Sequence, residues 1–346
     1  MTDTLNIWII KRNGETSDHR KTVSYEINRD YLTAEKSTFE VLEDVEFQNG
    51  DFLMAKFQDG KGVAFFGVID SSENKTIVCN DIFSLVNFEF PATRISGDSF
   101  ENHARNLINR YLIQDQNKVM NILDINVTSN TRHIYQPAEP PTPTNLMKYL
   151  INGFKKYNVV WSVDGIENGR IKSRIHACTD TIQIKDNVYS FIDWDVSTTE
   201  VGKGVENHIL IINKNTTNSE GPNILSQWWL TSDNEVVNNH DHPNIVKPTK
   251  TKVWIYDTTE EDKPSYEDVA NSELKGRYYS HEIMVKIPTD SEIIDFDILT
   301  IGRLATIVRN EVTYQSVLTG YLLNDEEEYI TLYFGHIRSR LSELLE

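Results

Sequence analysis

Short hydrophobic runs separated by polar turns dominate the first part of the chain. An apolar run within Met1–Ile10 predicts an opening strand, and later runs predict further strands. Pairs such as Gly50-Asp51 and Asp59-Gly60 are typical of the turns between them. The clearest of these strands are Val41-Leu42, Phe52–Phe57, Val63–Ile69 and Thr76–Cys79. Many short strands at regular spacing predict a small β-barrel, which we assign to residues 1–92.

After Pro91 the hydrophobic positions recur with a helical period. Asp98 or Ser99 is the expected N-cap of a first helix, and Thr144 that of a second helix after the Pro-rich segment 137–143. The apolar stripes of these helices indicate core packing rather than a cofactor groove. Strands at Val159–Val163 and Arg170–Ile175 follow, joined by a turn at Gly165–Gly169. Residues 93–190 are thus predicted to form an α+β domain with two helices.

The last part of the chain returns to strands, interrupted by polar loops. A strong strand is predicted at Ile209–Ile212, and strands resume at His281. We assign a second β-barrel to residues 191–238 and 293–346, and a small inserted β/loop domain to residues 239–292. A short helix is expected at Ser339–Glu346. The fold class is therefore mainly β with an α+β insertion.

The two ends of the chain show an approximate internal repeat. Gly50 and Gly302 each begin a turn followed by strand, turn, strand, turn and strand. The spacing from Gly67 to Ile77 equals the spacing from Gly320 to Ile330. Similar β units at both ends predict a duplicated barrel with other material between them.

Charge and cysteine content narrow the partners. The chain has 34 basic and 52 acidic residues, a net charge of -18, which repels phosphate and argues against specific nucleic-acid binding. An acidic wall would still suit a channel that passes DNA without retaining it, although the same charge would also serve solubility alone. Cys79 and Cys178 are far apart and are expected to be reduced. No signal peptide or membrane span is expected, so the protein would be made in the cytosol and bind no membrane.

Catalytic signatures are weak. No Gly-x-Ser-x-Gly elbow occurs, and Gly60-Lys61-Gly62 is expected to be a hairpin turn. His281-Glu282 lacks the second histidine of a zinc-protease helix and lies in a strand-like run. Asp193 and Asp195 would place two carboxylates on one strand face about 7 Å apart, which suits glycoside chemistry. Asp295 and Asp297 alternate in the same way. A solvated strand face is the favoured interpretation of both pairs.

Two further clusters have alternative interpretations. His240, Asp241 and His242 lie close enough in the sequence to ligate a metal, but we favour a polar loop because no distant ligand is identifiable. Trp228-Trp229 could form a sugar-stacking platform. In an alternating strand, however, one ring faces the core and the other a neighbouring surface. We therefore predict no catalytic, cofactor-binding or metal-binding residue, and no cofactor.

The chain resembles the baseplate-hub or tail-associated proteins of phages that infect Gram-positive bacteria, a siphophage tail family related to contractile-tail hubs. Patterns of strand and turn carry this resemblance in three regions of the sequence. They are Phe47–Leu53 with Phe66–Ile69 and Asp81–Leu85; Asn145–Leu150 with Gly153–Tyr157; and Ile301–Val308 with Tyr314–Gly320 and Leu332–Gly335. The resemblance implies two similar small β-barrel domains, an α+β domain and a small β domain that projects outward.

The resemblance also implies a non-enzymatic structural role in the virion, at the phage tail tip. Three copies would form a pseudo-sixfold ring that joins the hexameric tail tube to the tip and lets DNA or tape-measure protein pass. The implied partners are two further copies, the distal tail protein, other baseplate proteins and the tape-measure protein. Many relatives continue into a fibre or wall-degrading domain, whereas this sequence ends at Glu346. A cell-wall hydrolase using Asp193 and Asp195, or a host-glycan-binding module, are the alternative functions.

Overall fold

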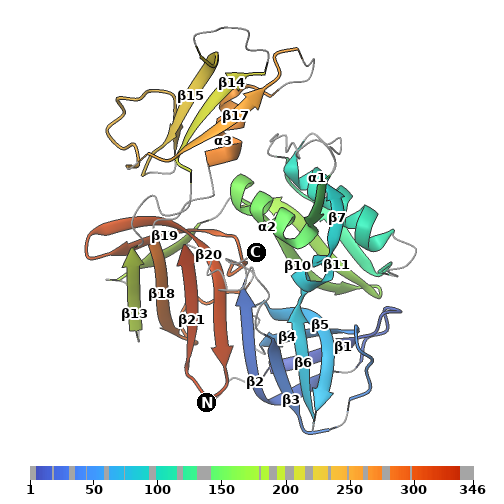
Figure 1. Ribbon diagram of the computed structural model, residues 1–346. Helices are drawn as coiled ribbons and strands as arrows, with labels where there is room; N and C mark the ends of the chain where they lie inside the picture. Colours follow the sequence, from blue (N-terminus) through green and yellow to red (C-terminus); the bar gives the residue numbers. More distant parts are fainter. Residues whose placement is uncertain are drawn as a thin grey trace.

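A computed structural model shows four structural parts (Figure 1). They are a β-barrel (the first unit), an α+β unit, a second β unit, and a small outer module. The structure describes residues 5–17, 19–30, 36–43, 45–57, 62–73, 75–92, 99–114, 120–130, 142–178, 181–186, 193–198, 206–214, 221–232, 235–247, 249–259, 264–274, 281–296 and 298–335. Among these residues, no helix is long and apolar enough to cross a membrane.

The first unit is a six-stranded barrel. Its strands lie in the order β1-β4-β5-β6-β3-β2, and β2 pairs back to β1 to close it. Alternation places one side chain in two inside, where Ile7, Ile27, Phe39 and Phe65 are fully buried or nearly so. The strands are β1 Leu5–Ile10, β2 Arg20–Asp30, β3 Ser37–Val41, β4 Phe52–Phe57, β5 Val63–Glu73 and β6 Thr76–Asp81. The β-barrel predicted for the first part of the chain is confirmed, and its strands end at Asp81.

The α+β unit packs two helices on a three-stranded sheet of order β10-β11-β8. A 3-10 turn at Ile82–Val86 leads into it, and α1 continues as a π-helical turn at Asn109–Ile113. A separate pair, β7–β9, lies beside it. The elements are β7 Glu89–Ala92, α1 Phe100–Ile108, β8 Leu123–Val127, β9 Thr142–Asn145, α2 Leu146–Tyr157, β10 Val159–Glu167 and β11 Arg170–Ala177. The expected pair of helices is present.

Local details of this unit differ from the sequence prediction. Ser99 caps α1 by accepting a hydrogen bond from the Asn102 amide. The cap of α2 is Asn145, one residue after the expected Thr144, and its Oδ1 accepts a hydrogen bond from Lys148 N. The β10–β11 turn is Asn168-Gly169 alone, both at positive φ, and Gly165 instead follows a bulge within β10. Ser99 was one of the two expected caps of α1. The expected cap of α2 was wrong by one residue, and the turn is shorter than expected.

The second unit contains six strands in the order β12-β19-β20-β21-β18-β13. Their bounds are β12 Ile182–Lys185, β13 Asp193–Thr198, β18 His281–Pro288, β19 Leu304–Arg309, β20 Val312–Asn324 and β21 Tyr329–Gly335. No pairing joins β12 to β13 among the described residues, so the described part is an open sheet. Of the two expected barrels, the first is confirmed and the closure of the second stays a prediction. The helix expected at Ser339–Glu346 lies outside the described residues.

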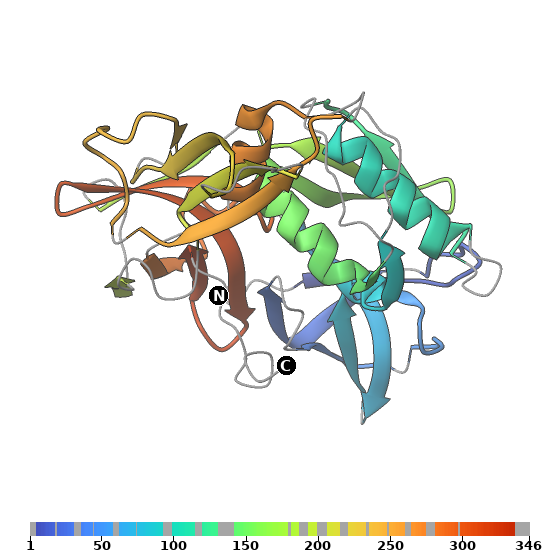
Figure 2. The same cartoon turned by 45° about the horizontal axis from the view of Figure 1, so that its top comes forward.

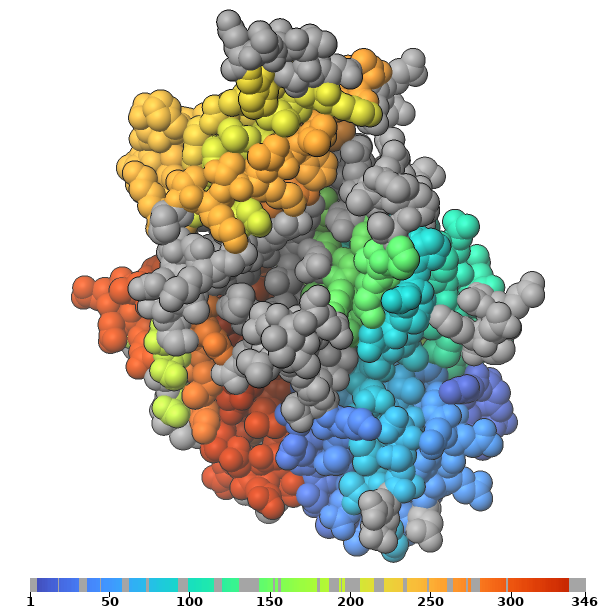
Figure 3. Space-filling view, in the orientation of Figure 1, coloured from blue at the N-terminus to red at the C-terminus, as the bar shows by residue number. Residues whose placement is uncertain are grey.

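The outer module is a four-stranded sheet of order β16-β15-β14-β17 with α3 on one face. Its elements are β14 His208–Asn213, β15 Ile224–Leu230, β16 Val236–Val237, β17 Thr251–Tyr256 and α3 Tyr266–Leu274. Pairing corrects the sequence-based boundaries: β14 to β16, expected in the second barrel, belong here, and β18, expected in the insert, belongs to the second unit. The helix α3 was not predicted. The module projects from the rest of the chain (Figures 2 and 3).

The two β units form one continuous twelve-stranded sheet because β2 pairs with β20. Glu26 lies opposite Asn324 and Asp30 opposite Gly320, in antiparallel register. Tyr321 of β20 reaches into the first unit, where its hydroxyl donates a hydrogen bond of 2.6 Å to the Ala64 carbonyl. We call this contact, formed by the ends of β2 and β20, the junction.

A buried ion pair holds the junction. Arg29 Nε lies 2.7 Å from Asp81 Oδ2, and the side chains are 14% and 2% exposed. Arg29 also lies over the Tyr321 ring, at 5.9 Å from its centroid. Burial alone would lower the pKa of Arg29, but the Asp81 carboxylate and Tyr321 raise it above the ordinary value. The other Asp81 oxygen accepts from Phe83 N, so one carboxylate links the junction to the turn that enters the α+β unit.

We expect Asp81→Asn to destabilise the protein by about 3 kcal/mol or more, because it leaves a buried guanidinium without its counter-charge. Asparagine keeps a side-chain oxygen to accept from Phe83, so the change isolates the charge. Asp70→Asn is the matched control, since the Asp70–Lys36 pair is 40% and 50% exposed and should contribute at most about 1 kcal/mol. Equal losses in chemical denaturation would contradict the assigned role of the ion pair.

His281 gives the second unit a pH-dependent contribution. Its ring Nε2 lies 2.9 Å from the Ser316 hydroxyl, and burial lowers its pKa to about 4. The unfolded chain takes up this proton near the ordinary pKa of about 6.5. The contribution is therefore fully present above that pH and is lost as pH falls from about 6.5 towards 4. His281→Gln should remove this component, roughly 3 kcal/mol between pH 7 and pH 4. Parallel pH profiles of unfolding free energy for both proteins would contradict it.

Candidate functional site

The same strand order is used twice in this chain. Numbered within each unit along the chain, both units run 1-4-5-6-3-2 across the sheet. All neighbouring pairs from the second to the sixth strand are antiparallel in both. The first strand differs, because β1 is antiparallel to β4 whereas β12 is parallel to β19. The repeat seen in the sequence thus corresponds to a repeated arrangement of five strands.

Two glycines fix the equivalence of residues. Gly50 N donates to the Ile69 carbonyl at 2.8 Å, and Gly302 N donates to the Leu318 carbonyl at 2.8 Å. In both units the residue after the glycine accepts from the same partner's amide, at 2.8 Å and 2.9 Å. Both glycines have positive φ, which favours glycine over other residues. Ile69 and Leu318 are therefore equivalent.

A β-bulge follows at the same place in both units. The β5–β6 register shifts between Ile69 and Ser71, and the β20–β21 register shifts between Leu318 and Gly320. Ser71 is thus the equivalent of Gly320. The equal spacing noted from Gly67 and Gly320 does not join equivalent residues, so that part of the sequence argument was wrong, while the Gly50 and Gly302 part is supported.

The bulge has a geometric consequence. A bulge bends its strand and increases the local twist, so the strand leaves its first neighbour. Before the bulge, β20 pairs with β19, and from Gly320 onwards the same edge pairs with β2. In β5 the edge before the bulge pairs with β4, and no pairing of that edge occurs at Ser71–Glu73 among the described residues. The end of β5 is therefore a free strand edge.

A second free edge lies at the other side of the molecule. Among the described strands, β13 pairs only with β18. Its equivalent in the first unit is β2, which pairs with β3 and with both β1 and β20. In Figure 1, β13 forms the left edge of the second unit, with the junction between it and β5. These two free edges, β13 and the end of β5, are the candidate functional surfaces.

The carboxylates considered for hydrolysis lie on the β13 edge. Asp193 and Asp195 are both on β13, as the alternation predicted, and both are exposed. Asp295 lies in a turn rather than a strand, so the predicted alternation there is wrong, and Asp297 lies outside the described residues. His281 and Glu282 are in the strand β18, as expected. Of the expected turn Gly60-Lys61-Gly62, only Gly62 is among the described residues.

The histidine cluster forms an exposed loop. His240 Nε2 lies 3.0 Å from Asp241 Oδ1, and His242 Nδ1 accepts from Asn244 N at 3.3 Å. Within the described part of the chain, no three His, Cys, Asp or Glu side chains gather closely enough to hold a metal ion. Cys79 is buried, and burial raises the pKa of its thiol. Cys178 is half-buried, its Sγ lies 3.7 Å from the Gly302 carbonyl oxygen, and both cysteines are reduced thiols, as expected.

The tandem tryptophans face opposite sides of the outer module. Trp228 packs against the small core under α3. Trp229 stacks on His208, with ring centroids 4.8 Å apart and 17° between the planes, and lies 6.3 Å from the His240 ring. His208 therefore covers one face of the Trp229 ring. Among the described residues, seven large hydrophobic side chains are exposed, and three of them lie on this module: Ile224, Val253 and Ile255. Their sheet face is a second candidate contact surface.

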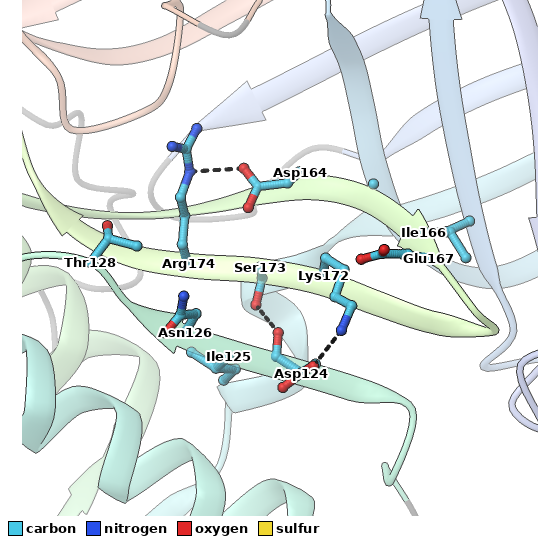
Figure 4. Close-up of a pocket in the computed structure, with 11 residues that line it drawn as sticks. Asp124, Ile125, Asn126, Thr128, Asp164, Ile166, Glu167, Lys172, Ser173 and Arg174 are labelled. Carbon is cyan, nitrogen blue, oxygen red and sulfur yellow. Dashed lines mark hydrogen bonds and ion pairs between the residues drawn. The ribbon is translucent and has the colours of Figure 1, made fainter.

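A depression of about 560 Å³ lies over β8, β10 and β11 (Figure 4). Ion pairs line it: Lys172 Nζ lies 2.7 Å from Asp124 Oδ2, and Arg174 Nε lies 2.8 Å from Asp164 Oδ1. The hydrogen bond from Lys172 lowers the pKa of Asp124. These charges already compensate one another across the sheet, so the depression offers paired surface groups rather than an arrangement of nucleophile and base.

No family model matches this sequence, and no curated protein matches it. Solved structures do. The 43 kDa tail protein of prophage MuSo2 from Shewanella oneidensis has a TM-score of 0.54 at 9% identity, over 96% of this chain and 98% of that one. Prophage tail protein gp18 from Listeria monocytogenes EGD-e has a TM-score of 0.52 at 9% identity, over 98% and 97%.

The tail protein from Neisseria meningitidis MC58 has a TM-score of 0.52 at 10% identity, over 96% of each chain. All three matches extend over nearly the whole of both chains, so they include both β units, the α+β unit and the outer module. At these identities the likeness is one of fold. The resemblance read from the sequence is confirmed at that level: over nearly its whole length, this chain has the fold of phage tail proteins.

Proposed function

We propose that this protein is a structural subunit of a phage tail tip or baseplate hub, and that three copies form a ring. The observation that supports this most strongly is the repeated strand order in the two β units. A chain with two similar units can present six similar positions when three copies surround one axis. Such a ring would join a hexameric tail tube to a threefold tip.

The closure of the second unit into a barrel is part of this proposal. Its six strands have the order of the closed barrel, and its β13 has a free edge as described above. The domain division is proposed as the four parts described, with the outer module inserted between β13 and β18. The protein would belong to the virion, at the tip of the tail, after synthesis in the host cytoplasm.

The surface chemistry supports a role in contact rather than catalysis. The solved structures that share the fold are described as prophage tail proteins. The net charge of -18 would let DNA or a tape-measure protein pass a central opening without tight binding. Contacts with the distal tail protein and other baseplate proteins are proposed on the fold alone. A non-enzymatic role follows as the proposed one.

Light scattering after size exclusion tests the ring directly. We expect three times the monomer mass at high protein concentration, with dissociation on dilution. Binding of duplex DNA should be weak even at low salt, because an acidic surface releases no DNA counterions on contact. A strict monomer at high concentration would overturn the proposed ring, and salt-sensitive DNA binding would overturn the proposed passage.

A further inference from the structure

In one chain, the free end of β5 belongs to the first unit and the free edge of β13 to the second, and the junction lies between them in the order of strands. A head-to-tail contact between unlike edges can continue from copy to copy, and it closes into a ring when the rotation permits. The chain already contains one contact between the equivalent strands, at the junction. The register of that contact is the template for a strand contact between two copies.

The template has a defined register. At the junction, Asn28 lies opposite Leu322 and Arg29 lies opposite Tyr321, in antiparallel pairing. Leu322 and Tyr321 follow Leu318 by four and three residues. Glu73 and Ser72 of β5 likewise follow Ile69, the equivalent of Leu318, by four and three residues.

The equivalents of the β2 residues follow from pairing across the sheet. Ile77 and Leu332 are equivalent, since they pair with Ser72 and Tyr321 beyond the shared bulge. From Ile77, pairing leads through Phe39 to Tyr25 of β2.

From Leu332, pairing leads through Val285 to Trp194 of β13. Tyr25 and Trp194 are therefore equivalent. Counting three and four residues onwards along each strand makes Asn28 equivalent to Ser197 and Arg29 equivalent to Thr198.

We propose that the end of β13 in one copy pairs antiparallel with the end of β5 in the next copy, with Ser197 opposite Glu73 and Thr198 opposite Ser72. The proposal rests on the proposed ring and names the strands that build it. It would satisfy backbone groups that both edges leave free, as edge strands do when they add to a sheet.

The contact between copies should be weaker than the junction. Tyr321, which is 1% exposed and donates to the Ala64 carbonyl, has Ser72 as its equivalent. Arg29, which forms the buried ion pair with Asp81, has Thr198 as its equivalent. The contact between copies therefore lacks the aromatic anchor and the ion pair, so copies should separate while each chain stays folded.

Paired cysteines test the register in the full-length protein. Ser197→Cys with Glu73→Cys should give disulfide-linked trimers on a non-reducing gel after mild oxidation. Asn28→Cys with Leu322→Cys is the positive control, because it should form the matching disulfide within one chain. Asp193→Cys with Glu73→Cys is the mismatched control, displaced by about 13 Å along the strand. Each single variant controls for Cys79 and Cys178.

The outcomes separate the two proposals. Linked trimers from the matched pair, with little product from the mismatched pair, support the strand contact. A trimer by light scattering that the matched pair does not link would overturn the strand contact and leave the ring standing. A ladder of linked species beyond three copies would support the strand contact and overturn the closed threefold ring. A protein that stays monomeric and unlinked would overturn both.

Discussion

The buried pairing of Arg29 with Asp81 is the constraint on which the rest of the arrangement depends. Arg29 lies next to the last residue of the strand that meets β20, and Asp81 ends the last strand of the barrel and caps the turn into the α+β unit. One carboxylate therefore connects three of the four parts. A buried pair of this kind is sensitive to removal of either partner, because the charge left behind has neither a counter-charge nor water around it. The Tyr321 hydroxyl adds a neutral link from β20 to β5.

The repeated strand order places equivalent strands in two different environments. In the second unit, the bulge after Leu318 directs β20 away from β19 and onto β2. In the first unit, the same bulge after Ile69 directs β5 away from β4 and ends at a free edge. The strand edge beyond the bulge is thus paired within the chain in the second unit, whereas in the first unit it has no pairing among the described residues. Free sheet edges are ordinarily covered or shortened in isolated proteins. Their presence at both ends favours repeated association of identical chains.

The surface of the chain fits this interpretation better than it fits catalysis. The acidic pair on β13 is exposed, and the histidine loop of the outer module is held by local hydrogen bonds. The depression on the α+β sheet is lined by ion pairs that already balance one another. Three exposed apolar side chains, Ile224, Val253 and Ile255, instead lie together on one face of the outer module, as expected of a contact surface.

Local sequence patterns were sufficient to predict most barrel strands of the first unit, although not β2, together with the two helices, Asp98 or Ser99 as the cap of α1, and the Gly50 and Gly302 turns. These features depend on hydrophobic period and turn chemistry, which neighbouring residues specify. The pairing of strands became known only from the folded structure. It moved β14 to β16 into the outer module, gave β18 to the second unit, and brought Arg29 to Asp81 across 52 residues. Strand pairing depends on contacts between distant segments, and a strand's own sequence does not identify its neighbour. The free edges could not be recognised from the sequence for the same reason.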